Sequence, residues 1–306
     1  MAERLRAALI VNAHARAGER AFALARSTLE AAGVELAVCA REARREPLAH
    51  TLERALEQRV PLVVVGGGDG TLHALAPRVA EAGATLGILP LGTGNDFARS
   101  LGLPLDVRQA CLVVAGGRTA SVDLGLVNER PFLNAVTVGI TTELTRRLTA
   151  PSKRLLGPAA YPLAALRAAW RLRRFEVEVV VDGVHRTMPA VQVVVGNARY
   201  QGGGRLIDPE ASATDRRLHG YVVLARHASR LANLFDLAGV GQGTRSGEHV
   251  RHASVWAFDG ERVQISTHPA RSLGADGELV GKTPAELSVL PGRLRVRVPV
   301  QASLEP

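Results

Sequence analysis

The order of apolar runs, helical segments and glycine-rich loops in the first third of the chain is the feature that most constrains its fold. Four short apolar runs alternate with three segments of helical spacing, and the last two runs lead directly into loops rich in glycine. The predicted strands and helices span, in turn, residues 7–11, 34–39, 61–65 and 85–89, and residues 19–32, 47–58 and 72–82. Parallel strands buried on both faces read as continuous apolar runs, and a helix usually connects them. The alternation therefore predicts a doubly wound parallel α/β sheet.

The pattern changes after about residue 120, where short β-rich runs replace the alternation. These runs span residues 121–127, 132–139, 175–181, 187–195, 218–224, 253–258, 262–267, 286–290 and 293–298. Asp182-Gly183 and Asp259-Gly260 are typical of hairpin turns, and one amphipathic helix is predicted over residues 159–172. We therefore expect an α/β domain over residues 1–124 and an antiparallel β-rich sandwich or barrel domain over residues 125–306. The last strand could rejoin the first domain.

The composition is that of an ordinary globular chain. Hydrophobic residues make up 46% and charged residues 22% of the 306 residues, so a full core needs no metal or disulfide. The two cysteines, Cys39 and Cys111, form no metal-ligand pattern and are typical of a reducing compartment. The apolar stretches are shorter than the roughly 20 residues of a membrane-spanning helix, and the N-terminus has no signal-peptide core. These features predict a cytoplasmic protein.

The net charge of +9, from 38 basic and 29 acidic residues, has two explanations. Only Lys153 and Lys282 are lysines, and such an arginine-rich composition often reflects the composition of a genome. The other explanation is an anionic partner, either a nucleotide, a phospholipid surface or a nucleic acid. Aromatic residues make up only 4% of the chain, which leaves few stacking platforms for single-stranded nucleic acid. Because no nucleic-acid-binding motif is present either, we expect no nucleic-acid partner.

The first glycine-rich loop, within VVVGGGDGT at residues 63–71, is the strongest local motif. Consecutive glycines let backbone N–H groups approach a phosphate closely, and the following helix adds its positive N-terminal end. Asp69 would repel a phosphate unless a cation lies between them, and Mg²⁺ prefers such oxygen ligands. The motif therefore predicts a phosphate site. The alternative is an ordinary strand-to-helix turn with Thr71 as the N-cap.

The second glycine-rich loop, PLGTGNDFARSLGLP at residues 90–104, follows the next predicted strand. Two adjacent parallel strands that end in such loops define a crevice at the carboxyl edge of the sheet, where open α/β sheets bind ligands. Thr93 and Asn95 can hydrogen-bond a phosphate or a ribose, and Asp96 adds a second acidic group at that edge. Taken alone, the loop could be another capped helix start.

Both loops resemble those of the diacylglycerol-kinase catalytic-domain family, which includes bacterial lipid kinases and the sphingosine and ceramide kinases. GGDGT is shared with NAD kinases and phosphofructokinases, whereas LGTGNDFARSLGLP is more specific to the lipid-kinase branch. Further matching segments follow in order along the chain: Phe132-Leu133-Asn134 with Gly139, residues 155–170, Asn197 with Gly202-Gly203-Gly204, Pro209 with Ala211 and Asp215, and Asp276-Gly277-Glu278. The resemblance implies an ATP-binding α/β domain, a β-rich lipid-substrate domain and catalysis in the cleft between them.

The resemblance also implies roles for individual residues. The residues expected to bind ATP are Asn12, Gly67, Gly68, Asp69, Gly70, Thr71, Thr93 and Asn95. Asp69 and Asp96 would join a Mg²⁺–water network, and Glu278 would be the general base that takes the proton from the lipid hydroxyl. Without the resemblance, Asp276-Gly277-Glu278 is typical of a plain hairpin turn.

The chain departs from the family pattern at several positions. The clearest single-residue departures are Ala13 after Asn12, where the family usually has Pro, His73, where it commonly has Asn, and Thr141, where it often has Asp. The family's structural metal site falls by register on Ser212, Asp215 and Arg217, and its Asp-Gly pair is here Asp215-Arg216. Losing this glycine removes easy access to positive φ, and the arginines could compensate the carboxylate without a metal. A retained and a lost metal site both stay open.

These features favour an ATP- and Mg²⁺-dependent lipid kinase that meets a lipid alcohol, such as diacylglycerol, through peripheral contact with an anionic membrane. Two alternatives remain: an NAD-kinase-like small-molecule kinase, and a non-catalytic nucleotide- or phospholipid-binding protein on the same scaffold. The basic segment 153–174 could contact a membrane surface, although an interdomain helix with a solvated face explains it better. Formation of a homodimer stays open.

Overall fold

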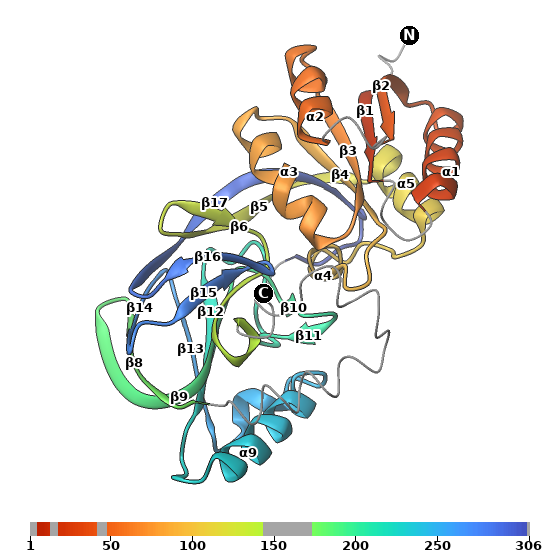
Figure 1. Cartoon of the computed structure of the whole chain (residues 1–306). Helices are drawn as coiled ribbons and strands as arrows, with labels where there is room; N and C mark the ends of the chain where they lie inside the picture. Colours follow the sequence, from red (N-terminus) through yellow and green to blue (C-terminus); the bar gives the residue numbers. More distant parts are fainter. Residues whose placement is uncertain (1–4, 13–17, 42–47, 143–172, 305–306) are drawn as a thin grey trace.

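The computed structural model describes residues 5–12, 18–41, 48–142 and 173–304 (Figure 1). Its N-terminal half is built on a parallel sheet in the order β4-β3-β1-β2. The four strands are β1 (Arg6–Val11), β2 (Glu35–Arg41), β3 (Leu62–Gly67) and β4 (Thr85–Pro90). The helices that cover its two faces are α1 (Gly18–Ala31), α2 (Leu48–Glu57), α3 (Asp69–Glu81) and α5 (Val107–Gly116). The predicted doubly wound parallel sheet is confirmed.

Alternate residues of the central strands face the two helical layers. Leu9 and Val64 pack with the buried side chains of α1 and α5 on one face of the sheet. Ile10 and Val63 pack with those of α2 and α3 on the other face. Because successive strand residues point to opposite faces, a sheet covered on both sides needs uninterrupted apolar strands, which is the pattern that the sequence shows.

The helices around the glycine-rich loops differ from the sequence prediction. Helix α3 begins at Asp69 rather than at residue 72, so the acidic residue of the first loop lies in the first turn of a helix. Helix α4 (Asp96–Ser100) was expected only in the alternative interpretation of the second loop as a helix start, and helix α5 was not predicted. A signal for α5 was present, because the Asp106 side chain caps it by accepting the Gln109 N–H at 2.9 Å.

The C-terminal half is rich in antiparallel strands, as predicted. Its larger elements are β5 (Arg118–Val127), β6 (Arg130–Phe132), β7 (Ala135–Gly139), β8 (Phe175–Val181), β9 (Val184–Gly196), β12 (Leu218–Leu224), α9 (Arg230–Gly243), β13 (Val255–Gly260), β14 (Arg262–His268), β15 (Ser272–Ala275), β16 (Glu278–Lys282) and β17 (Ala285–Val298). The helix predicted over residues 159–172 lies outside the described residues. Within the described ranges, no helix is long and apolar enough to cross a membrane.

One of the two predicted hairpin turns is confirmed and the other is wrong. Asp182-Gly183 joins β8 to β9, which pair up to Val181 and Val184 on either side of the turn. Asp259-Gly260 does not join paired strands, because β13 pairs with β12 whereas β14 pairs with β8 and β17. A turn signal is local, but the partner of a strand is decided by the whole sheet.

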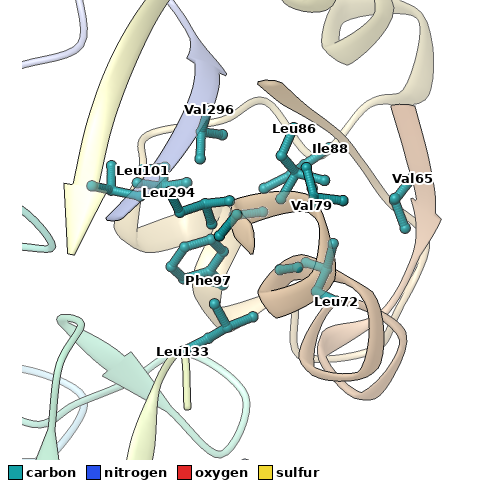
Figure 2. Packing of buried hydrophobic residues seen from close by; sticks show 14 of the residues in the cluster. Val65, Leu72, Val79, Leu86, Ile88, Phe97, Leu101, Leu133, Leu294 and Val296 are labelled. Carbon is teal, nitrogen blue, oxygen red and sulfur yellow. The ribbon is translucent and has the colours of Figure 1, made fainter. Parts of the chain in front are cut away.

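Strand β17 connects the two halves of the molecule (Figure 1). It replaces the two strands expected over 286–290 and 293–298, with an irregular register between Leu290 and Leu294. Its first part pairs with β14, and its end runs parallel to β4. Leu294 and Val296 thus enter the core of the α/β half beside Phe97 (Figure 2). The parallel and antiparallel regions form one continuous 15-stranded sheet.

Candidate functional site

The two glycine-rich loops lie against each other at the carboxyl ends of β3 and β4. A Cβ atom on Gly68 would lie 2.9 Å from the Gly92 Cα, and one on Gly92 would lie 2.5 Å from the Gly68 Cα. Asn95 closes the second loop, because its Oδ1 accepts the Gly92 N–H at 2.8 Å and its Nδ2 donates to the Gly92 carbonyl at 3.0 Å. Both glycines are therefore required by backbone packing, whether or not a ligand is bound.

The N-terminus of α3 is open. Gly68 is the N-cap and forms no side-chain cap hydrogen bond, and a Cβ on Gly70 would meet no atom within 4 Å. Thr71 is not the N-cap, so that part of the alternative is wrong, although the loop is a strand-to-helix turn. The Thr71 hydroxyl instead accepts a hydrogen bond from the Asn12 Nδ2 at 3.0 Å. A helix N-terminus without a side-chain cap offers its first backbone N–H groups and the positive end of its dipole to an anion. The first turn of α3 could therefore hold a phosphate.

The carboxylates of Asp69 and Asp96 lie near the same point beside Gly94. A Cβ on Gly94 would lie 3.0 Å from the Asp69 Oδ2 and 3.4 Å from the Asp96 Oδ2. The other oxygen of Asp69 accepts the Phe97 N–H at 3.2 Å. Burial, and then the neighbouring Asp96 charge, raise the pKa of Asp69 above its ordinary value. The Asp96 charge therefore opposes ionisation of Asp69 unless a cation lies between them.

Asp96 connects the second loop to the C-terminal half. Its side chain is buried and accepts the Gly203 N–H at 2.9 Å and the Gly204 N–H at 2.6 Å. Both glycines have positive φ, 91° and 83°, which a residue with a Cβ adopts only at a cost. The glycine triplet at residues 202–204 thus has a physical role that the sequence alone did not reveal: it directs backbone donors at Asp96.

This pair of carboxylates fits a Mg²⁺ ion. Magnesium is commonly held by one or two protein carboxylates, with water and phosphate oxygens completing its shell. Asp69 and Asp96 supply two carboxylates beside an anion-binding helix terminus, and a cation would lower the raised pKa of Asp69. Across the described part of the chain, no group of three or more His, Cys, Asp or Glu side chains is placed to hold a metal by itself.

The segment Asp276-Gly277 forms the turn between β15 and β16, with φ values of 46° and 87°. The Asp276 side chain is fully buried and accepts three backbone N–H groups from the start of β7 and the two residues before it. These donors are Leu133 at 2.7 Å, Asn134 at 2.8 Å and Ala135 at 3.1 Å. Asp276 therefore anchors the hairpin, and this part of the motif has a structural role.

His73 joins the hairpin to α3. Its Nδ1 lies 2.9 Å from the Asp276 Oδ2, and its Nε2 lies 4.0 Å from the Glu278 Oε2. His73 follows Asp69 by four residues, so both side chains lie on one face of α3. The contact thus brings Glu278 to the helix face that carries Asp69. The Glu278 side chain is 67% exposed, as in a plain hairpin turn, and it is open to an incoming substrate.

Replacing His73 is expected to destabilise the protein in a pH-dependent way. The hydrogen bond to Asp276, more than the Asp276 and Glu278 charges, raises the pKa of His73 against the effect of burial. A raised pKa means that protonation of His73 stabilises the folded protein. This stabilisation is complete below the unfolded-state pKa of about 6.5. It is lost as the pH rises through the folded-state pKa of His73. We expect His73→Asn to lower the free energy of unfolding by about 1–3 kcal/mol in acid, and by less in alkali.

Urea denaturation of wild type and His73→Asn across this pH range measures the difference. His50→Asn on the exposed side of α2 is the matched control, and it should show no comparable trend. A destabilisation by His73→Asn that is constant with pH would contradict the charged pair.

The residues expected to hold a structural metal form a different arrangement. Asp215 Oδ2 accepts the Ser212 N–H at 2.9 Å and lies 2.8 Å from the His219 Nε2, while its Oδ1 accepts the Arg217 N–H at 2.9 Å. Arg216 keeps the positive φ, 62°, although it is not glycine. Backbone N–H groups and the His219 ring thus contact both oxygens of the Asp215 carboxylate, and a metal held by Ser212, Asp215 and Arg217 stays a prediction.

Arg99 is a further candidate that the sequence reasoning missed. Its Nε donates to the Gly94 carbonyl at 2.9 Å and lies 3.7 Å from where a Cβ on Gly204 would be. Its guanidinium is exposed at the edge of the site, where it could contact a phosphate. The only signal was its place in the second motif, in the last turn of α4.

Two family models match the chain. The diacylglycerol kinase catalytic domain matches residues 6–127, and the YegS C-terminal NAD kinase beta sandwich-like domain matches residues 134–298. A diacylglycerol kinase of Staphylococcus epidermidis is 31% identical over 273 residues, which cover 89% of this chain and 84% of that protein. A YegS-like lipid kinase of Klebsiella pneumoniae is 32% identical over 262 residues, 83% of each chain.

A solved structure shares the fold over the whole length. It is that of a Bacillus anthracis protein assigned to the diacylglycerol kinases, with a TM-score of 0.78, 25% identity, and coverage of 99% of this chain and 98% of that one. The family models, the relatives and this solved structure therefore agree on one family for both halves of the chain. The chain belongs to the diacylglycerol kinase family, and the predicted resemblance is confirmed.

Proposed function

We propose that this lipid kinase transfers the γ-phosphoryl group of ATP to the hydroxyl of diacylglycerol or a related lipid alcohol, with Mg²⁺, at a membrane surface. The observation that carries the proposal is the convergence of three groups in one place. The Asp69–Asp96 carboxylates lie near Gly94 at the open N-terminus of α3, and His73, one helical turn further along α3, contacts the hairpin that bears Glu278. Phosphoryl transfer needs a phosphate cradle, a cation and an oriented nucleophile.

Apart from Gly67, the last residue of β3, the residues expected to bind ATP divide into two groups. Gly68, Asp69 and Gly70 lie at the N-terminus of α3, where backbone N–H groups can face phosphate oxygens, whereas the Thr71 N–H already donates to the Gly68 carbonyl at 2.9 Å. Thr93 lies exposed on the adjacent loop. Asn12 and Asn95 instead act through other residues: Asn12 holds the Thr71 hydroxyl, and Asn95 holds the Gly92 backbone. We therefore assign positioning roles to these two asparagines.

Asp69 and Asp96 would hold Mg²⁺, which when bound neutralises charge on the phosphate oxygens. Glu278 is open to solvent and would accept the proton of the lipid hydroxyl while that oxygen attacks the γ-phosphorus. His73, 4.0 Å from the Glu278 carboxylate, keeps the hairpin against α3. The proton then leaves Glu278 to solvent, which reaches its exposed side chain.

Gly70 provides a direct test of the phosphate cradle. We expect Gly70→Ala to weaken ATP binding by about tenfold or more, equivalent to about 1.4 kcal/mol. The added methyl group meets no protein atom within 4 Å, so it occupies space that the phosphates need. Helix propensity predicts equal or slightly higher stability for Gly70→Ala.

Gly68→Ala is the contrasting variant, because its methyl group must displace the Gly92 backbone and should lower stability. Calorimetric ATP titration and urea denaturation measure both, and unchanged ATP affinity in Gly70→Ala would place the phosphates elsewhere.

A panel of acceptors tests the reaction itself. Wild-type protein with ATP and Mg²⁺ is incubated with diacylglycerol, a sphingoid base, a ceramide and NAD, and the products are separated by chromatography. We expect a phosphorylated lipid from at least one lipid alcohol. Phosphorylation of NAD alone would support the NAD-kinase-like alternative, and ATP binding with no product would support the non-catalytic one.

A further inference from the structure

Helix α9 turns a row of apolar side chains toward solvent. Leu231 is 61% exposed and Phe235 is 69% exposed, and Ala238 is exposed three residues further on. This spacing places the three side chains on one face of the helix. The opposite face packs on the protein through the buried Asn233 and Val240. The helix lies at the end of the molecule away from the parallel sheet (Figure 1).

A strongly basic pocket borders the N-terminal end of this helix. It has a volume of about 600 Å³, and the residues that line it are Arg173, Arg174, Val191, Ala228, Arg230, Asn233, Pro269 and Arg271. Four of these eight are arginines, and none of the described lining residues is acidic. Part of this wall is held in place, because Arg271 donates to the Arg174 carbonyl at 3.4 Å and lies over the Phe175 ring. The like charges of Arg173, Arg174 and Arg230 around one cavity repel each other and favour an anion between them.

We propose that the exposed face of α9 and this arginine pocket form the surface by which the enzyme docks on an anionic bilayer. Leu231 and Phe235 enter the interface between headgroups and acyl chains, and the pocket receives the phosphate of an anionic phospholipid. The inference deepens the proposed function and rests on it, because a lipid kinase must reach its substrate at a membrane.

The charges on the helix support a bilayer as the occupant. Segment 226–245 holds the basic residues Arg226, Arg230 and Arg245 and one acidic residue, Asp236. The Asp236 carboxylate accepts the Ser254 hydroxyl at 2.7 Å and lies 3.3 Å from the His227 Nε2, so it is engaged with neighbouring side chains. An exposed aromatic and a leucine flanked by arginines are typical of helices that lie in the interface of anionic membranes.

Sedimentation with vesicles tests the surface. The vesicles are phosphatidylcholine with or without phosphatidylglycerol, and the variants are Leu231→Ser with Phe235→Ser, and Arg173→Gln with Arg230→Gln. Wild type should bind the anionic vesicles, with an affinity that falls as salt rises, and each double variant should bind them about tenfold or more weakly. Leu112→Ser with Arg108→Gln on α5 is the matched control, because Leu112 is 54% exposed. It should bind as wild type does.

Equal binding of all four proteins would overturn the proposal, as would equal binding of wild type to neutral vesicles. Release from the vesicles by inorganic phosphate, but not by sodium chloride of equal ionic strength, would mark the pocket as a free-phosphate site and also overturn it. Circular dichroism checks that the double variants are folded; their substitutions lie at exposed positions on the surface.

Turnover separates this proposal from the proposed function. If both are right, the α9 variants lose activity toward diacylglycerol in vesicles and keep it toward a dispersed short-chain diacylglycerol. If wild type binds the anionic vesicles as expected but phosphorylates no lipid, the kinase proposal fails while the docking surface stands.

Discussion

Asp69→Asn is expected to lower lipid-kinase turnover by about 10³-fold or more, equivalent to about 4 kcal/mol of transition-state stabilisation. Asp69 lies in the first turn of α3 with its Oδ2 beside Asp96. Asparagine keeps the size of the side chain but removes the charge that would hold the cation. Turnover is measured at saturating ATP and Mg²⁺, with Asp259→Asn, a half-exposed surface carboxylate, as the control.

The same substitution should leave stability unchanged or raise it. Because burial and the Asp96 charge raise the pKa of Asp69, its ionised form destabilises the fold at neutral pH when no cation is bound. A neutral asparagine removes that cost. A folded Asp69→Asn protein with turnover within a few-fold of wild type would contradict the role of Asp69 in catalysis. A loss of turnover accompanied by a clear loss in the free energy of unfolding would indicate a structural role instead.

Glu278→Gln is the second large effect, an expected loss of about 10²–10⁴-fold in turnover. Glutamine keeps the shape of the side chain but accepts no proton from a hydroxyl. ATP affinity should stay the same, because the phosphates are assigned to α3, and stability should stay the same, because the side chain is 67% exposed. The plain hairpin interpretation predicts the opposite for turnover, an almost silent substitution.

Turnover and ATP binding of Glu278→Gln are compared with those of Glu261→Gln, another exposed glutamate of the β-rich half. Near-wild-type lipid phosphorylation by Glu278→Gln would contradict the assignment of Glu278 as the general base, while the proposed nucleotide site would be unaffected. A loss that also appears in the control would point to surface charge rather than to proton transfer.

The sequence predicted the parallel half well because its strands are buried on both faces. Leu9 and Ile10 each face a different helical layer, so the apolar run is continuous and easily recognised. The start of α3 was predicted too late, because glycine and aspartate are poor helix formers that the open N-terminus nevertheless uses. Helix α9 was missed because its apolar residues are spread between an exposed and a buried face, which weakens its periodicity.

Long-range contacts explain what the sequence could not predict of the candidate site. The resemblance drew attention to Asp276 and Glu278, but it gave no role to His73. This histidine lies 203 residues before Asp276 in the sequence and forms a hydrogen bond with it. Likewise, Asp96 receives its donors from Gly203 and Gly204, more than 100 residues later. Such pairs leave no local pattern. The roles of Asp69, Asp96 and Glu278 in the reaction remain predictions.

The central claim is that a phosphoryl group passes from ATP to a lipid hydroxyl in this site. ATP labelled in its γ-phosphate, diacylglycerol in anionic vesicles and Mg²⁺ are incubated with wild type, and the label in the extracted lipid is compared with the ADP formed. We predict labelled phosphatidic acid in equal amount to ADP, and neither with Asp69→Asn. ADP without labelled lipid from any lipid alcohol offered, or equal lipid labelling by Asp69→Asn, would contradict the claim.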